Sequence, residues 1–209
     1  MGRYTGPVCR LCRQVGEKLF LKGARCYTPA CAVDKRRRPP GAATRQTRRR
    51  ASEYGVRQRE KQKLRYSFGL LERQFAGYVE RAQGMPGITG QYLVQLLERR
   101  LDNVVYRLGF GESRNQARQF VTHGLVTVNG RKMDIPSAIL KAGDVITWKD
   151  SAKQKEFVKA RMTGGPRQAV PKWLSLDQAA MEGKVLGLPQ PEDSDVKMDT
   201  RLIVEFYTR

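Results

Sequence analysis

Residues 113–133, SRNQARQFVTHGLVTVNGRKM, contain the signals that decide the fold. Ser113 is followed three residues later by a glutamine, the spacing of a helix-capping box, so a helix begins here. The helix should end at Gly124, because glycine most easily adopts the left-handed conformation that follows a helix. Asn129 and Gly130 then supply the two positive φ angles of a tight hairpin turn. The stretch therefore predicts a helix followed by a β-hairpin.

The flanking sequence extends this unit on both sides. Apolar residues from Tyr92 to Leu108 recur with the strongest helical period in the chain, which predicts a helical run with one buried face. Glu98 and Asp102 share a face of that run, but the adjacent arginines favour ion pairing over acid–base catalysis. After the hairpin, strand alternation resumes at Val145. Helices and a small antiparallel sheet together indicate an α+β fold.

The charge of the chain points to a polyanionic partner. The 209 residues include 40 Lys and Arg against 20 Asp and Glu, a net charge of +20. Residues 1–65 hold 19 of the cations and only four acids. Such an excess favours binding to nucleic acid. No stretch approaches the roughly 18 apolar residues of a membrane helix, and the first residues lack the apolar run of a secretory signal. We therefore expect a cytoplasmic protein without a membrane partner.

The charge is densest in a basic arm, Lys35–Arg50, which reads KRRRPPGAATRQTRRR. It has eight cations, no acid and a Pro-Pro-Gly break, so it cannot build a core of its own. We expect it to contact phosphates, with a solubilising or localisation segment as the alternative. The candidate contacts in the arm are Arg36, Arg37, Arg38, Arg48, Arg49 and Arg50.

Four cysteines near the N-terminus have the spacing C-x2-C-x13-C-x4-C. They are Cys9, Cys12, Cys26 and Cys31. Two short pairs separated by a loop can supply four thiolates to one tetrahedral ion, which predicts a structural zinc site. An iron–sulfur cluster uses the same ligands and remains an alternative. Disulfides are disfavoured, because a chain without a secretory signal stays in a reducing compartment.

The sequence also predicts a helix from Ser52 to Tyr66, which carries a basic stripe. Arg57, Lys61 and Arg65 are spaced four residues apart and so lie on one face. Few acids are close in sequence, so we expect this stripe to contact RNA, with a solvated face as the alternative.

A second basic surface is expected on the helix and hairpin of residues 113–133. Arg114 lies in the first helical turn, where a cation opposes the helix dipole but suits an incoming phosphate. Arg118 follows one turn later, and Arg131 and Lys132 flank the hairpin turn. We expect these four side chains to be exposed and to form one basic face. Further candidate RNA contacts are Arg3, Tyr4, Arg10, Lys22, Tyr54 and His123, with the two tyrosines expected to stack on unpaired bases.

These motifs together carry a resemblance. The stretches 100–110, 113–118, 128–131 and 143–144 resemble the small RNA-binding domain named after ribosomal protein S-four. The cysteine pattern, the helix around residues 57–64, Trp173-Leu174-Ser175-Leu176-Asp177 and the closing Ile203-Val204-Glu205-Phe206-Tyr207 extend the match over essentially the whole chain. The chain is identified as a member of the bacterial small-subunit ribosomal protein S-four family, in its four-cysteine form.

This resemblance implies both an architecture and a role. Residues 1–45 form the metal knuckle and basic arm; residues 46–92 together with 180–209 form a discontinuous helical domain; and residues 93–179 contain the RNA-binding module, at about 99–162. The family implies a structural protein that binds 16S ribosomal RNA at a multi-helix junction of the 5′ domain. It also implies a part in nucleating small-subunit assembly and in translational accuracy. The implied partners are the fifth small-subunit protein and the chain's own messenger RNA.

Two other classes of function remain as alternatives. The same module occurs in RNA-modifying enzymes, but such an enzyme needs a catalytic domain. The residues after the module show no nucleophile elbow, phosphate loop or paired carboxylates. A zinc-containing DNA regulator would need a recognition helix after its cysteines, whereas a proline-broken arm follows them here. We therefore expect no enzymatic activity.

Overall fold

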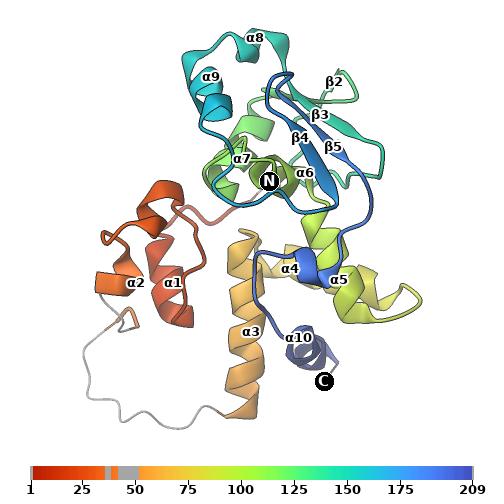
Figure 1. The fold of residues 1–209 in the computed structure, drawn as a ribbon. Coiled ribbons are helices and arrows are strands. Elements are labelled where there is room, and N and C mark those ends of the chain that lie inside the picture. The colour runs from red at the N-terminus through yellow and green to blue at the C-terminus, as the bar shows by residue number, and fades with distance from the viewer. Residues whose placement is uncertain (1, 36–38, 42–51, 209) are drawn as a thin grey trace. The chain divides into compact units, whose positions relative to one another are not determined.

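The computed structural model describes residues 2–35, 39–41 and 52–208, and the chain divides into two compact units (Figure 1). Unit 1 comprises Met1–Leu93 and Asp195–Arg209, and unit 2 comprises Val94–Ser194. No helix in the described ranges is long and apolar enough to cross a membrane.

Unit 1 is helical throughout its described part. Its elements are α1 (Cys9–Val15), the 3-10 helix η1 (Gly23–Tyr27), α2 (Ala32–Lys35), α3 (Glu53–Ser67), α4 (Glu72–Gln83), the first half of α5 (Thr89–Glu98) and α10 (Thr200–Tyr207). As expected, Ser52 caps α3, and its hydroxyl accepts a hydrogen bond from the Gly55 N–H over 3.2 Å. The last helix, α10, packs along α3 although the whole of unit 2 lies between them in the sequence (Figure 1).

Two apolar clusters stabilise unit 1. Near the N-terminus, buried side chains of α1 and of the loop after it pack with Tyr66 of α3; they are Leu11, Cys12, Val15, Leu19 and Leu21. Under α10, Phe75 of α4 is fully buried and its ring centroid lies 6.1 Å from that of Tyr207. The Lys61 ammonium lies 4.3 Å from the Phe206 ring centroid, a cation–π contact between α3 and α10.

Unit 2 combines helices with one antiparallel sheet, so the expected α+β class is confirmed for it. Its elements are the second half of α5, α6 (Leu101–Arg107), α7 (Arg114–Thr122), β1 (Val126–Val128), β2 (Arg131–Lys132), β3 (Val145–Trp148), α8 (Asp150–Lys153), α9 (Glu156–Thr163), β4 (Leu174–Asp177), β5 (Glu182–Val185) and the 3-10 helix η2 (Pro191–Asp193). The strand order is β2-β1-β3-β5-β4, with antiparallel pairing throughout.

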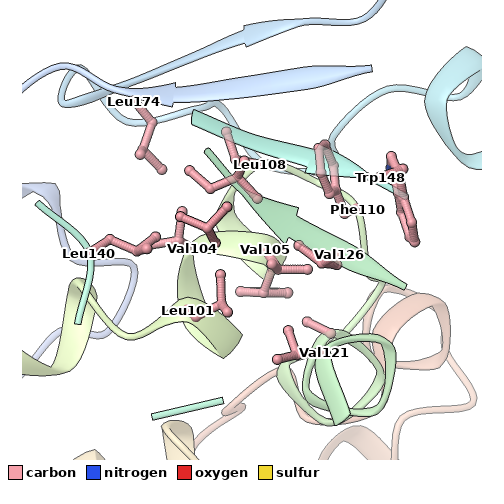
Figure 2. Close-up of a cluster of buried hydrophobic side chains, with 14 of the residues drawn as sticks. Leu101, Val104, Val105, Leu108, Phe110, Val121, Val126, Leu140, Trp148 and Leu174 are labelled. Carbon is pink, nitrogen blue, oxygen red and sulfur yellow. The ribbon is translucent and has the colours of Figure 1, made fainter. Parts of the chain in front are cut away.

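The core of unit 2 lies between α6, α7 and the sheet. Val104 and Val105 of α6, Val121 of α7 and Val126 of β1 are fully buried there; Val105 lies on the side of Val126 and Val121, and Val104 on the side of Leu140 (Figure 2). Trp148 of β3 stacks on Phe110, with ring centroids 5.1 Å apart. This shared core holds α7 on the sheet and thereby fixes which face of α7 meets solvent.

The helix and hairpin predicted from residues 113–133 are confirmed. Ser113 caps α7 and accepts from the Gln116 N–H over 3.3 Å. Gly124 follows α7 with φ 64°, and Asn129 and Gly130 have φ 51° and 76°. The resulting register pairs Thr127 with Lys132.

The helical run expected from Tyr92 to Leu108 is interrupted. α5 ends at Glu98 and α6 begins at Leu101, because Arg100 adopts an extended ψ of 136° and forms a β-bridge to Ile139. The Leu101 N–H donates to the carbonyl of Ala138 over 2.9 Å. A pairing with a segment distant in the sequence replaces the helical hydrogen bonds, and sequence periodicity contains no sign of it.

The domain boundaries also differ from the expected ones. Residues 182–185, which we assigned to the helical domain, form β5 and pair with β3 and β4 in unit 2. The chain re-enters unit 1 at Asp195. Gly183 permits this placement, since a Cβ atom there would lie 2.3 Å from the Leu108 side chain.

Candidate nucleic-acid interface

The basic stripe of α3 is largely enclosed by acidic and aromatic side chains of unit 1. Arg57 Nε donates to Glu205 Oε2 of α10 over 2.9 Å. Lys61 Nζ and Arg65 Nη1 lie 2.8 Å and 3.2 Å from the carboxylate of Glu72. The expectation that these cations lack acidic partners is wrong, because α10 and α4 bring Glu205 and Glu72 to them and Glu53, one turn earlier on α3, lies 3.4 Å from Arg57. The stripe holds unit 1 together, and its contact with RNA stays a prediction.

Tyr207 of α10 is a further hydrogen-bond partner of the Glu72 carboxylate. Its hydroxyl donates to Glu72 Oε1 over 2.7 Å. Burial raises the pKa of Tyr207, and the adjacent Glu72 carboxylate raises it further. Burial alone raises the pKa of the Glu72 carboxyl, but the hydrogen bonds from Lys61 and Tyr207 outweigh it, so the pKa of Glu72 is lowered.

Arg114 and Arg118 are buried in unit 2, so the expectation that they are exposed is wrong. Arg118 is 6% exposed, and its Nη1 donates to Asp102 Oδ2 over 3.0 Å. Arg114 is 9% exposed, and its Nε donates to Asn103 Oδ1 over 2.8 Å. Both side chains run back toward α6 instead of outward, because α6 presents these two acceptors to α7.

These contacts belong to a larger buried polar network at the α5–α6 junction. Arg100 makes two hydrogen bonds to Asp102, of 3.0 Å and 2.6 Å. Asn103 donates to the Glu98 carboxylate over 2.7 Å. Arg107 donates to the backbone carbonyl of Asp193. The pairing expected between the acids of this region and its arginines is confirmed for Arg100 and Asp102.

The remaining candidate contacts are exposed where the structure describes them. Arg131 and Lys132 flank the hairpin turn, and Lys132 Nζ lies 3.5 Å from Asp134. The other exposed candidates are Arg3, Tyr4, Arg10, Lys22, Tyr54 and His123. Arg36, Arg37, Arg38, Arg48, Arg49 and Arg50 lie outside the described residues. Contact of all these side chains with RNA stays a prediction.

The four cysteines lie in α1, in η1 and just before α2, and they carry no disulfide. The Lys22 N–H donates to Cys26 Sγ over 3.3 Å, and the Leu19 N–H is hydrogen-bonded to Cys12. Burial raises the pKa of both thiols, and nearby cysteines raise it further. Thiols that influence one another and accept backbone N–H bonds fit a thiolate-bound metal. The described residues nonetheless contain no group of three or more His, Cys, Asp or Glu side chains already arranged around one ion.

A pocket of about 510 Å³ lies on unit 2 between α7 and the start of α9. Its lining residues are Gln116, Gln119, Phe120, His123, Leu125, Lys155 and Phe157. Of these, only His123 was among the sequence candidates. The signal available in the sequence was Phe157, the single aromatic residue in the polar stretch 151–168.

Comparison with known proteins matches the entire chain. Residues 3–98 match the family described as ribosomal protein S4/S9 N-terminal domain, and residues 99–146 match the S4 domain. The chain is 53% identical to the small ribosomal subunit protein uS4 of Halothermothrix orenii and 52% identical to that of Heliobacterium modesticaldum. It is 50% identical to that of Thermus thermophilus. Each similarity covers 100% of both sequences.

Proposed function

Because the chain belongs to the uS4 family of small ribosomal subunit proteins, we propose that it is a structural component of the small ribosomal subunit that binds ribosomal RNA. The observation that carries this function is similarity over the full length to proteins of that name. We propose a structural rather than a catalytic role, since those relatives are named as parts of the ribosome.

The proposed mechanism is neutralisation of phosphates by a pre-formed scaffold. Exposed cations such as Arg131 and Lys132 contact the RNA backbone and release counterions. The buried arginines of unit 2 orient the helices that present those cations. The site on the RNA is a multi-helix junction in the 5′ domain of 16S RNA, where early binding nucleates assembly and supports accuracy.

A binding experiment tests this function. The full chain is titrated onto a transcript of the 16S RNA 5′ domain, with chemical footprinting of the junction. We expect protections at the junction, and a loss of affinity for the double variant Arg131→Glu and Lys132→Glu. The control is the double variant Arg131→Lys and Lys132→Arg, which keeps both positive charges and should bind as the wild type does. The absence of any footprint by the wild type would overturn the function.

We further propose that Cys9, Cys12, Cys26 and Cys31 together hold one structural zinc ion. The spacing of the four thiols in the sequence and the two backbone N–H bonds to sulfur support this. A bound zinc ion would crosslink two segments that have a small apolar cluster of their own. An iron–sulfur cluster is the alternative with the same ligands.

The family resemblance supports two additional partners. We propose that the fifth small-subunit protein is a neighbour in the assembled subunit and that the chain's own messenger RNA is a second ligand. Crosslinking within purified small subunits tests the first proposal, and competition between the messenger leader and the 5′-domain transcript tests the second.

A further inference from the structure

The pocket between α7 and α9 has an exposed aromatic wall. Phe157 is 45% exposed, yet its ring stacks on Phe120 with centroids 5.7 Å apart and an interplanar angle of 24°. Phe120 in turn meets the buried Trp148 edge to face, at 5.3 Å. A large apolar ring that is half open to solvent but fixed by its neighbours is a pre-formed stacking surface.

Amide side chains line the same pocket. Gln116 and Gln119 lie one turn apart on α7, on the face turned away from the core. The Gln116 side-chain oxygen accepts from the Glu112 N–H over 2.7 Å, which fixes the orientation of its amide group. Carboxamides present both donors and acceptors and can therefore pair with the polar edge of a base.

A lysine and a histidine complete the lining. The Lys155 ammonium lies 6.0 Å from the Phe157 ring centroid, and His123 lines the pocket from the end of α7. Glu156 begins α9 but is not part of the lining. An anionic group attached to whatever fills the pocket would meet a cation.

We propose that this pocket binds one unpaired base of the ribosomal RNA, with the base stacked on Phe157 and its phosphate near Lys155. The inference rests on the proposed RNA-binding function and adds a site for single-stranded recognition to it. Unpaired bases are characteristically stacked on aromatic side chains and hydrogen-bonded on their edges. A flat ring, two amides and the adjacent Lys155 ammonium meet those requirements together. A base-paired duplex has no base available to enter the pocket.

The test compares three variants of the full chain on the 16S RNA 5′-domain transcript. Phe157→Ala removes the stacking surface and should weaken binding about tenfold. Phe157→Tyr keeps an aromatic ring and should bind as the wild type does. Ile135→Ala, a matched truncation of a side chain that is 50% exposed in unit 2 and does not line the pocket, should have no effect. Base-specific chemical probing should show an unpaired nucleotide that the wild type protects and Phe157→Ala exposes, while the other protections remain.

A fourth variant guards against the possibility that Phe157→Ala misfolds. Gln119→Ala truncates an exposed residue, so it should fold normally and still weaken protection of the same nucleotide. Unchanged affinity and an unchanged footprint for both Phe157→Ala and Gln119→Ala would overturn the inference while leaving RNA binding intact. Unchanged RNA binding with poor incorporation into small subunits would instead assign the pocket to a protein neighbour and would also overturn it. If the wild type gives no footprint at all, the failure belongs to the proposed function.

Discussion

The Arg118 guanidinium donates to the Asp102 carboxylate over 3.0 Å, with both side chains less than a tenth exposed. This ion pair joins α7 to the start of α6 in the interior of unit 2. Arg118 therefore belongs to the interior scaffold of unit 2. Asp102 also accepts two hydrogen bonds from Arg100, so it stays paired when Arg118 is replaced, and the cost of the replacement is the lost charged hydrogen bond.

Arg118→Ala is expected to lower the free energy of unfolding of unit 2 by about 2 kcal/mol, because it removes a buried hydrogen bond between charged groups while Asp102 keeps its two hydrogen bonds from Arg100. Both tryptophans of the chain lie in unit 2, so intrinsic fluorescence during urea unfolding measures this change. The exposed Arg131→Ala serves as the control and should shift stability by at most about 0.5 kcal/mol. Equal effects of the two substitutions would contradict the structural role of Arg118.

Tyr207→Phe should destabilise unit 1 by about 1 kcal/mol near neutral pH, because it removes the hydrogen bond to Glu72. The pKa of the Glu72 carboxyl is lower in the folded chain, so the unfolded chain binds more protons as the pH falls. The stabilisation is therefore present above the ordinary carboxyl pKa of about 4.3 and is lost below it. Circular dichroism melts of both proteins at several pH values should show their difference shrinking in acid. In a Glu72→Gln background that pH dependence should disappear.

Cys12→Ser should release the proposed metal. Mass spectrometry under non-denaturing conditions is expected to show one zinc ion per wild-type chain and none per variant chain. Loss of the ion should expose the region of α1 and η1 to protease while α3 to α10 stay protected, because the N-terminal cluster is small. Retention of the metal after two of the four cysteines are replaced would eliminate the site, and iron with sulfide in place of zinc would select the alternative cluster.

Replacing Arg48, Arg49 and Arg50 by Ala should flatten the dependence of log affinity on log salt concentration by about two units. This expectation comes from the charge density of the sequence. Preference for the cognate junction over unrelated RNA should persist, because folded RNA is recognised largely by shape. Either of two results would refute the idea that the arm supplies salt-sensitive affinity and the folded part supplies the preference. One is an unchanged salt dependence; the other is a lost preference for the junction with undiminished affinity for random RNA.

Local signals in the sequence predicted local structure well. The caps Ser52 and Ser113 and the turn at Asn129 and Gly130 lie where their residue types indicated. Each of these features depends on the chemistry of residues close together in the chain. Short-range periodicity and capping therefore sufficed for α3, α7 and the first hairpin.

The predictions that were wrong concern side chains and backbone segments whose partners lie elsewhere in the sequence. Lys61 and Arg57 were expected to lack partners, because Glu72 and Glu205 lie 11 and 148 residues away. Glu53, four residues before Arg57, also pairs with it and was a local signal that was missed. The extended Arg100 depends on pairing with Ile139. Arg114 was placed at the surface by a helix-dipole argument that ignored Asn103, its buried acceptor. Residue type and spacing do not encode the pairings between distant residues, which determine which cations are exposed to RNA.

The packing of α10 on α3 bears on the order in which the chain folds during its own synthesis. Unit 2 is one uninterrupted stretch, Val94–Ser194, and can fold as soon as it emerges. Unit 1 is assembled from two stretches on either side of unit 2. The packing of α10 on α3 can therefore form only after the whole of unit 2 has been translated. During that interval the apolar surface of α4 that Tyr207 later covers is open. During synthesis, unit 2 can therefore be fully folded while unit 1 still lacks its last helix.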